Sequence, residues 1–193
     1  MEIKELLTKN RTYRRFHNEY IVTKEQLIEL IEMTRLIPSA ANLQPLSYKV
    51  FNDMKMNKKI YSTLKWAGYL KNWEGPIDSE RPSAYIIILC NKDISKNCDI
   101  DVGIASQTIL MKSTEMGLGG CMFGAINKTK LSEIIQINNA KNLKIKLVIA
   151  LGKPKEKVKL INIDKNESIK YYRDKENIHY VPKRKLKDIL DIE

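Results

Sequence analysis

The chain has 193 residues, 43% of them hydrophobic, which suits one globular domain with a buried core. Lysine and arginine number 34 against 23 acidic residues, and the net charge of +11 favours anionic partners: a phosphate-bearing cofactor, a nucleic acid or a membrane surface. No apolar run approaches the roughly 20 residues of a membrane span, and the first residues lack the apolar region of a signal peptide, so we expect a cytoplasmic protein.

Helices and strands alternate along the first half of the chain. A capping box beginning at Thr23 opens a run of apolar residues at helical spacing, which Pro38 ends. Alternation predicts a strand over 47–52, and residues 54–70 predict a helix with exposed lysines. The continuous run 84–91 is rich in β-branched residues, which is typical of a buried strand rather than an edge.

The second half continues the same mixed order. Residues 99–116 form the clearest predicted helix, with Gly117 placed to end it. A short helix is expected over 129–135 and a strand over 143–151, followed by a polar, lysine-rich stretch and a final helix over 183–190. This order predicts the α+β class, with helices covering a sheet.

Cysteine and histidine usage argues against a metal site or a disulfide framework. Cys90, Cys98 and Cys121 are odd in number and form no C-x-x-C pair, and the two histidines are His17 and His179. We therefore expect reduced cysteines, a reducing compartment and no bound metal.

Two segments near the start could bind an anionic or flat ligand. R-T-Y-R-R at residues 11–15 combines three guanidiniums with a hydroxyl, donors that match phosphate oxygens, although a solvated basic turn is the alternative. P-S-A-A-N-L-Q-P at residues 38–45 combines small side chains with two amides, which suits the edge of a heterocycle or simply connects a helix to a strand.

Two later segments are compatible with the same chemistry. G-L-G-G-C-M-F-G at residues 117–124 has four glycines, which indicate backbone N–H groups close to a ligand or else a helix stop followed by a strand. It matches neither a G-x-G-x-x-G fingerprint nor a Walker motif. K-R-K at residues 183–185 would place cations at a helix amino end, where a bound anion relieves the clash with the helix dipole; a fraying basic tail is the alternative.

The ordered set of motifs resembles the FMN-dependent nitroreductase superfamily. The motifs that carry the resemblance are R-T-Y-R-R-F at 11–16, P-S-A-A-N-L-Q-P at 38–45, D-x-G-I-A-x-Q at 101–107, G-L-G-G-C-M-F-G at 117–124 and V-I-A-L-G-K-P at 148–154. The ending Y-Y-R-D and H-Y-V-P-K-R-K-L is similar to that of the smaller bacterial members. The resemblance implies one domain over 1–193, a central, mostly antiparallel sheet covered by helices, and an intertwined homodimer with an FMN at each of two interface sites.

The resemblance also implies which residues hold the cofactor. The phosphate and the flavin edge would be bound by the 11–15 segment and by Lys183 or Arg184, and the ring would be lined by the 38–45 turn of the partner chain and by the 121–123 backbone. The full implied set is Arg11, Thr12, Arg14, Arg15, Ser39, Ala40, Asn42, Gln44, Cys121, Met122, Phe123, Lys183 and Arg184. Arg14 or Arg15 would stabilise the reduced flavin. Asn10 stands where the family often has arginine, which leaves open which arginine faces the phosphate.

The implied activity is a ping-pong cycle. NADH or NADPH first delivers hydride to flavin N5, and the reduced flavin then passes the electrons to a nitroaromatic, a quinone or a similar acceptor. The chain accordingly shows no catalytic set of histidine, cysteine and carboxylate, and Cys121 is interpreted as a packing residue. Residues 66–81 would form a flap that covers the substrate with Tyr69 or Trp73, or else a surface helix with aromatic packing.

Other functions stay open at this point. The same fold could serve dehalogenation, enone reduction or flavin handling, or bind flavin without turnover. A basic nucleic-acid-binding domain is the alternative from another class, but the aromatic residues do not interleave with the basic ones and no helix-turn-helix or RNP pattern occurs. We expect a homodimer with a small-molecule acceptor and with neither a nucleic-acid nor a membrane partner, and a C-terminal extension, 155–193, that reaches the partner subunit.

Overall fold

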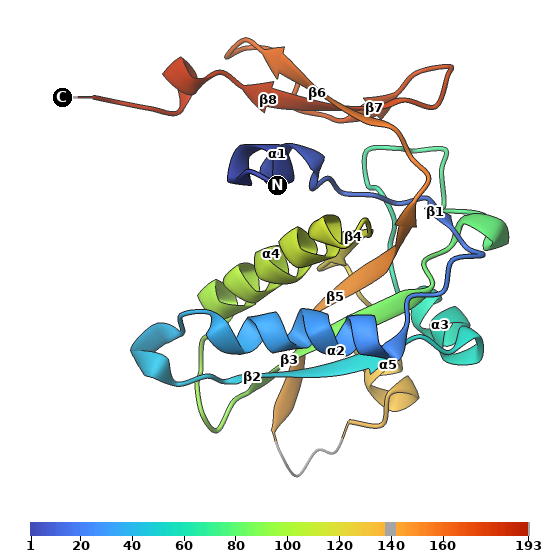
Figure 1. The fold of residues 1–193 in the computed structure, drawn as a ribbon, viewed down its shortest axis with the longest axis vertical. Coiled ribbons are helices and arrows are strands. Elements are labelled where there is room, and N and C mark those ends of the chain that lie inside the picture. The colour runs from blue at the N-terminus through green and yellow to red at the C-terminus, as the bar shows by residue number, and fades with distance from the viewer. Residues whose placement is uncertain (138–141, 193) are drawn as a thin grey trace.

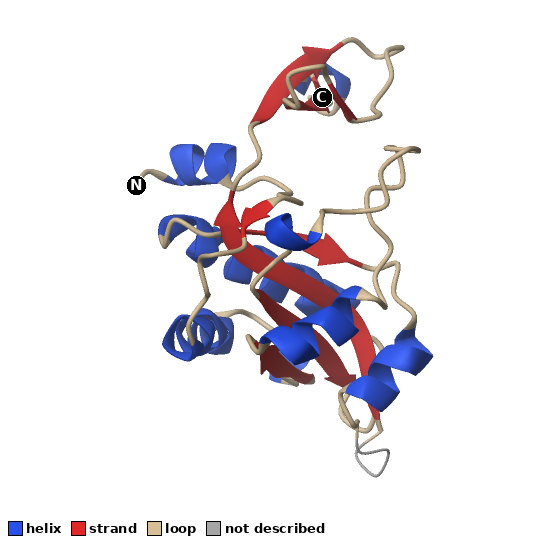
Figure 2. Cartoon of the chain, turned by 90° about the vertical axis from the view of Figure 1, so that its right-hand side faces the viewer, coloured by secondary structure: helices blue, strands red, loops and turns tan. Residues whose placement is uncertain are grey.

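The computed structural model describes residues 1–137 and 142–192, and it contains two sheets, the larger with helices on both faces (Figures 1 and 2). The helices and strands are α1 (Ile3–Lys9), β1 (Phe16–His17), α2 (Lys24–Met33), β2 (Leu46–Phe51), α3 (Met54–Tyr61), β3 (Ala84–Asn91), α4 (Asp99–Glu115), β4 (Gly119–Phe123), α5 (Lys128–Ile134), β5 (Leu143–Pro154), β6 (Val158–Ile163), β7 (Tyr172–Arg173) and β8 (His179–Arg184). The predicted α+β class is confirmed.

The larger sheet is antiparallel throughout. Its strand order is β1-β5-β3-β2, and β4 also pairs with β5. β3 lies between β5 and β2, and its residues from Ala84 to Cys90 are all buried. The continuous apolar run that predicted an internal strand is explained by this position, because both faces of β3 are covered.

Two hydrophobic cores form on the two faces of this sheet. Since successive residues of a strand point to opposite faces, Ile86 and Ile88 of β3 pack on one side while Ile87 and Leu89 pack on the other. The first core is closed by α2 and α4, through residues that include Leu27, Leu30, Val102, Ile109 and Leu110. The second is closed by α3 and α5 and by the 64–66 segment, through residues that include Ile60, Leu64, Trp66 and Leu131.

Local signals in the sequence fix where the two long helices begin and end. Thr23 and Gln26 form the predicted capping box at the start of α2. At the end of α4, Gly117 adopts a φ of 73° and its N–H donates to the Thr114 carbonyl, while the Leu118 N–H donates to the Ser113 carbonyl. This Schellman motif explains the glycine at this position, because a left-handed residue carries a steric cost for any side chain.

The helix predicted over 54–70 is too long. α3 ends at Tyr61, and the following residues turn back toward the sheet, where Leu64 bridges to Ile126. Trp66 is buried against Phe123, with ring centroids 4.6 Å apart. Packing of this large aromatic residue overrides the helical preference of the lysine-bearing stretch that precedes it.

The final helix predicted over 183–190 is wrong. Residues His179–Arg184 form β8, which pairs in parallel with β6 and antiparallel with β7, and Pro182 stands opposite Ile161 in that register. Only a 3-10 turn, Leu186–Asp188, follows. The three strands make a second sheet that lies above α1 (Figure 1). The helix-dipole argument for a bound anion at Lys183 therefore no longer applies.

The expectation of reduced cysteines is also wrong for one pair. Cys90 at the end of β3 and Cys98 just before α4 form a disulfide, with Cα atoms 6.6 Å apart, while Cys121 is free and buried. An odd cysteine count says nothing about a single bridge between two cysteines eight positions apart. No helix in the described ranges has the length and apolar character needed to cross a membrane.

Candidate functional site

The first basic segment lies directly against β4. Thr12 forms a parallel bridge with Gly120, and the Tyr13 N–H donates to the Gly120 carbonyl over 3.0 Å. Arg14 follows and lies close enough to Cys121 that its charge acts on the pKa of that thiol. Two of the four predicted segments, 11–15 and 117–124, are therefore brought together by backbone pairing.

The glycines of β4 are explained by packing within the chain. A Cβ atom on Gly119 would come within 2.5 Å of the Tyr13 ring, and one on Gly120 within 2.5 Å of the Ala150 carbonyl oxygen. These positions exclude side chains whether or not a ligand is bound. Along the same strand Met122 is 44% exposed, while Cys121 and Phe123 are buried, so within the segment whose backbone was predicted to line the ring only the Met122 side chain reaches solvent.

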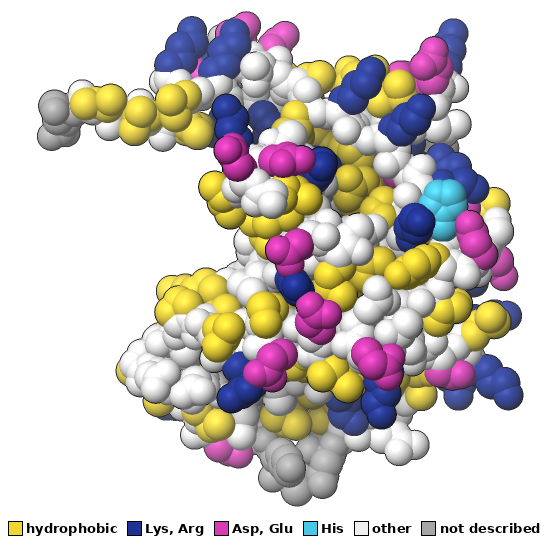
Figure 3. Space-filling model, in the orientation of Figure 1, with side chains coloured by type: hydrophobic (Ala, Val, Ile, Leu, Met, Phe, Trp, Pro, Cys, Tyr) yellow, Lys and Arg dark blue, Asp and Glu magenta, His cyan; other side chains and the backbone are white. Residues whose placement is uncertain are grey.

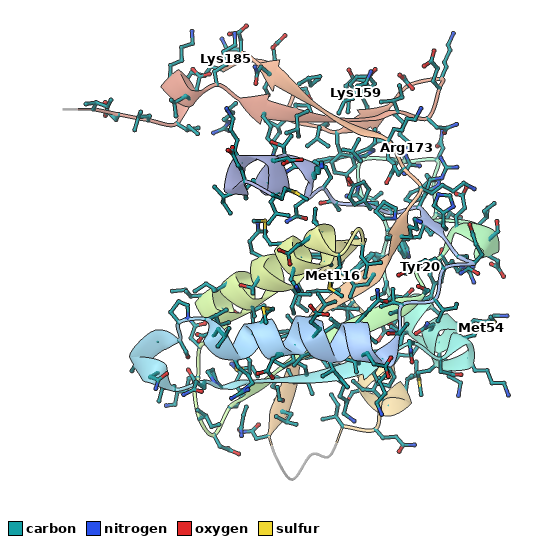
Figure 4. All side chains as sticks on the ribbon, viewed as in Figure 1. Tyr20, Met54, Met116, Lys159, Arg173 and Lys185 are labelled. Carbon is teal, nitrogen blue, oxygen red and sulfur yellow. A yellow bond between two sulfur atoms is a disulfide. The ribbon has the colours of Figure 1, made fainter. Side chains whose placement is uncertain are left out.

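Arg14 belongs to a buried cluster built with the C-terminal strands. Its backbone N–H donates to Glu156 Oε2 over 2.9 Å, and its guanidinium lies 3.4 Å from His179 Nε2 and 4.7 Å from the centre of the Tyr171 ring. The Glu156 carboxylate is in turn occupied by the guanidinium of Arg173, labelled in Figure 4. Among the described residues no carboxylate forms an ion pair with the Arg14 guanidinium, although Arg14 is only 8% exposed.

His179 adds no charge to this cluster near neutral pH. It is 1% exposed, and burial lowers the pKa of its imidazole to about 4, although the nearby Glu156 acts in the opposite direction. Its Nδ1 is 4.0 Å from Glu156 Oε1 and has no hydrogen-bond partner among the described residues. A neutral imidazole beside Arg14 neither neutralises nor repels the guanidinium.

Cys121 is a thiol, not a thiolate, near neutral pH. Burial raises the pKa of its side chain to about 12, and Glu156 acts in the same direction while Arg14 opposes it. Because the thiolate is the nucleophilic form of cysteine, this environment disfavours covalent chemistry at Cys121. The geometry supports its interpretation as a small packing residue.

Arg15 takes a different role from its neighbour. Its Nε and Nη2 donate to the two oxygens of Glu80 over 2.5 and 2.8 Å, and Lys155 Nζ lies 3.1 Å from the same carboxylate. The hydrogen bonds from Arg15 hold the pKa of Glu80 at about 2. With its fork engaged in this bidentate pair, Arg15 is not favoured as a ligand for a cofactor.

Arg11 and Thr12 leave donors available next to the cluster. Arg11 Nη2 donates to the Leu7 carbonyl at the end of α1 over 2.5 Å, while its Nε is buried with no partner among the described residues. Burial lowers the pKa of this guanidinium. Thr12 is exposed, so its hydroxyl can bind a ligand.

The 38–45 turn is well defined but lies far from Arg14. The Gln44 N–H donates to Ser39 Oγ over 2.9 Å, and the Gln44 side-chain amide donates to Asn42. Asn42 and Gln44 both have positive φ, and Ala40 belongs to the same turn. The turn lines a cavity of about 190 Å³ with Asp101, in the first turn of α4. β4 follows the opposite end of that 17-residue helix. At 1.5 Å per residue the two ends are roughly 25 Å apart.

The remaining predicted residues all involve the C-terminal part of the chain. Lys183 and Arg184 are exposed on β8, and Lys185, labelled in Figure 4, pairs with Asp164. In the predicted flap, the Tyr69 ring lies 5.0 Å from the Tyr171 ring, and the Arg173 guanidinium lies 4.3 Å from the centre of the Trp73 ring. The flap segment therefore contacts the same residues that surround Arg14.

Sequence reasoning missed the residues that hold Arg14. They are Glu156, Tyr171, Arg173 and His179. Tyr171, Arg173 and His179 stand in the ending motifs, which gave a signal, but the burial of Glu156 in a lysine-rich stretch follows only from the three-dimensional fold.

A family model described as the nitroreductase family matches residues 7–73 and 85–153. The chain belongs to the nitroreductase family. A relative from Archaeoglobus fulgidus, named as an NADH dehydrogenase/NAD(P)H nitroreductase, is 25% identical over 150 residues, which cover 74% of this chain and 80% of the relative. The family match ends at Lys153, so the C-terminal strands that surround Arg14 lie outside it.

Solved nitroreductase structures share the fold. A nitroreductase family protein from Clostridium novyi aligns with a TM-score of 0.67 and 24% identity, covering 80% of this chain and 88% of that one. A structure from Clostridium difficile, described as an FMN-dependent nitroreductase, aligns with a TM-score of 0.66 and 21% identity over 80% of this chain and 89% of that one. At such identities the likeness concerns the arrangement of the sheet and its helices, and it accounts for the confirmed antiparallel sheet.

Proposed function

We propose that this nitroreductase-family chain is an FMN-dependent oxidoreductase that uses NADH or NADPH to reduce a small acceptor such as a nitroaromatic compound or a quinone. The observation that carries the proposal is the buried Arg14 guanidinium beside β4, which has no carboxylate partner among the described residues. The FMN-dependent relative from C. difficile and the NAD(P)H nitroreductase name of the A. fulgidus relative support the choice of cofactor and reductant.

The residues present fit an anionic, flat cofactor. A buried cation without a counter-charge is costly, and an anion placed beside it offsets that cost. The unpartnered Arg11 Nε and the exposed Thr12 hydroxyl supply further donors for phosphate oxygens. Bound FMN would supply hydride acceptance from the nicotinamide and transfer of two electrons to the acceptor, chemistry that no side chain of this chain provides.

The side chains would act by binding and by electrostatics. Arg14 would hold negative charge that develops on the reduced flavin, and the backbone bond to Glu156 fixes where Arg14 stands. Neutral His179 and the protonated Cys121 thiol add no competing charge near neutral pH. Thr12 and Arg11 would bind phosphate, and exposed Lys183 and Arg184 remain available for it.

A second copy of the chain would complete the site. Within one chain the 38–45 turn lies beside the first turn of α4 and Arg14 lies beside β4, which follows the last, and the two ends of that helix are roughly 25 Å apart. One flavin ring does not span that length. We therefore assign Ser39, Ala40, Asn42 and Gln44 to the cofactor bound at the Arg14 of the partner subunit. Such a site needs an extended interface between copies.

An apolar groove supports that homodimer. A cavity of about 500 Å³ runs between α1, the 33–38 segment and α4, and its lining includes Leu6, Leu36 and Ile104. α1 buries none of its residues and exposes Ile3 and Leu7, and hydrophobic side chains gather on this side of the molecule in Figure 3. A contiguous exposed apolar surface of this kind is typical of an interaction site.

The predicted contact of the C-terminal extension with the partner is proposed only for its end. Glu156 and His179 of this extension pack against Arg14 of their own chain, and the last residue lies outside the described part.

The proposal is tested by purifying the full chain in air and recording its visible spectrum. We expect the absorption of oxidised flavin, bleaching on anaerobic addition of NADH or NADPH, and recovery on addition of a nitroaromatic compound or a quinone. A colourless protein that takes up no added FMN would falsify the proposal. Lys24→Ala, which removes an exposed cation at the start of α2 outside the proposed site, is the control for Arg14→Ala.

A further inference from the structure

Arg173, labelled in Figure 4, neutralises Glu156, the carboxylate of the Arg14 cluster. Its Nε donates to Glu156 Oε1 over 3.1 Å, and its Nη2 donates to the same oxygen. The other carboxylate oxygen, Oε2, accepts the backbone N–H of Arg14. Glu156 therefore holds the main chain of Arg14, while the negative charge of Glu156 is balanced by Arg173.

The C-terminal strands fix the place of the Arg173 side chain. Arg173 of β7 stands opposite His179 of β8, so the two side chains emerge on the same face of the small sheet. The guanidinium Cζ also lies 4.3 Å from the centre of the Trp73 ring, in a cation–π contact. Both residues of β7 and all of β8 lie beyond residue 153, where the match to the family model ends.

An unbalanced charge in this cluster would act strongly on Arg14. The Arg173 side chain is 11% exposed and that of Glu156 is fully buried, so water and salt screen their charges little. Together the two side chains are neutral. Without Arg173, the negative charge of Glu156 would oppose the positive charge of the Arg14 guanidinium, which has no carboxylate partner among the described residues.

We propose that Arg173 is a positioning residue for reduction of the cofactor: by balancing Glu156, it keeps Arg14 as the cation that favours the reduced, negatively charged flavin. The inference rests on the proposed flavin function. Arg173 acts through Glu156 and needs no contact with the cofactor. Removing Arg173 should weaken binding of the reduced cofactor relative to the oxidised one, removing Glu156 should strengthen it, and removing both should leave it near the wild-type value.

The test measures the two-electron midpoint potential of the flavin bound to the full chain. Arg173→Met should lower the ratio of reduced to oxidised affinity about tenfold, equivalent to about 30 mV, which is the effect of one unit charge roughly 12 Å away in the protein. Glu156→Gln should raise the ratio by a similar factor, and the double variant should return to within about twofold of the wild type. Shifts of the same sign in both single variants, or a double variant that stays shifted, would overturn the proposal.

Two further variants separate charge from packing. Because both Arg173 donors reach one oxygen, Arg173→Lys can still balance Glu156 and should keep most of the wild-type potential. Lys175→Met removes a cation two residues away, at an exposed position where water screens it, and should leave the potential unchanged. A shift in Arg173→Lys as large as in Arg173→Met would contradict a role of the charge. If Arg173→Met does not fold, the comparison of Glu156→Gln with the double variant decides.

The imidazole of His179 gives a second readout that needs no cofactor. It lies 3.4 Å from Arg14 Nη1 and 4.0 Å from Glu156 Oε1. Burial lowers the pKa of His179 to about 4, Glu156 opposes this, and Arg14 and Arg173 add to it. In an NMR titration of the full chain, Arg173→Met should therefore raise the pKa of His179, with the more exposed His17 as the internal reference.

The two readouts distinguish failure of this role from failure of the proposed function. A chain that binds no FMN would contradict the flavin function and the role of Arg173 with it. A flavin-containing protein in which Arg173→Met changes neither the midpoint potential nor the pKa of His179 would contradict the role of Arg173 alone.

Discussion

Arg14 and Arg15 are neighbours in the sequence, yet they lie in two clusters that engage their guanidiniums differently. Arg15 and Lys155 surround Glu80, so that cluster contains two cations on one carboxylate and remains partly open to water. In the other cluster Glu156 is fully buried and taken by Arg173, which leaves the Arg14 guanidinium facing a neutral imidazole and an aromatic ring. The first cluster links Arg15, just before β1, to the 78–80 turn. In the second, the Arg14 guanidinium has no carboxylate partner among the described residues.

This difference shows how two identical side chains acquire different environments. A guanidinium held in a bidentate pair is already satisfied, whereas one that is buried without a counter-charge gains from any anion that reaches it. The comparison therefore favours Arg14 over Arg15 as the residue that stabilises negative charge on the reduced cofactor. Four experiments test it, beginning with the largest expected effect.

Breaking the Glu156 cluster should cost the most stability. Glu156→Gln leaves Arg173 buried without its partner, and we expect the free energy of unfolding to fall by about 3 kcal/mol. Glu80→Gln should cost only about 1 kcal/mol, because water still reaches Arg15 and Lys155, which are 23% and 44% exposed. Urea unfolding of both variants measures the contrast, and equal losses would contradict the distinction between the two clusters.

Removing the Arg14 guanidinium should cause the largest loss of activity. Arg14→Ala is expected to lower kcat/KM about a hundredfold, the usual effect of losing one group that stabilises developing charge, while Arg14→Lys should recover most of it. Glu80→Gln, which leaves Arg14 untouched, serves as the control and should stay within about twofold of the wild type. Anaerobic stopped-flow reduction by NADPH or NADH provides the measurement, and an Arg14→Ala variant with wild-type kinetics would end the assignment.

Acid should weaken the two clusters over different pH ranges. An unfolded histidine binds a proton near pH 6.5, but folded His179 does so only near pH 4, so its contribution to stability is complete above 6.5 and lost as the pH falls to 4. Glu80 loses its contribution lower, between about 4.5 and 2. The urea unfolding midpoint should therefore depend less on pH between pH 4 and 8 in His179→Gln than in the wild type. An unchanged pH dependence would show that the imidazole is not the titrating group.

The smallest effect is expected at the proposed flap. Tyr69 is 49% exposed and contacts Tyr171 beside Arg14, so Tyr69→Ala should leave stability within about 0.5 kcal/mol while raising KM severalfold for bulky acceptors. Trp73→Ala removes packing on Trp66 as well and serves for comparison. If kcat/KM is unchanged for every acceptor in both variants, residues 66–81 have no role in covering the substrate.

Local sequence signals predicted the central sheet and its long helix closely. The run 84–91 is β3 to the residue, and the helix expected over 99–116 is α4, Asp99–Glu115. Both depend on patterns that repeat every two or every 3.6 residues, which a single sequence reveals. Pro182 and Lys183 gave an equally local signal for a helix, but pairing with β6, some twenty residues earlier, made this segment a strand.

The choice between the two arginines depended on contacts that no local pattern contains. Glu80 lies 65 residues from Arg15, and Glu156 lies 142 residues from Arg14. In the sequence both carboxylates stand among many others of the same kind, and only burial and pairing distinguish them. The resemblance identified the basic segment and its order among the motifs, while the structure distinguishes the side chain that is engaged from the one that is free of a carboxylate.

The same long separation determines when the site can form during synthesis. Arg14 leaves the ribosome near the beginning of translation, whereas His179, which lies beside it in the fold, comes 165 residues later. Contacts of such high sequence separation assemble late, after the intervening chain is available. A nascent or prematurely terminated chain could therefore build the central sheet and still lack the enclosure of Arg14. With the cofactor bound at Arg14 as proposed, its loading would depend on completion of the C-terminal strands.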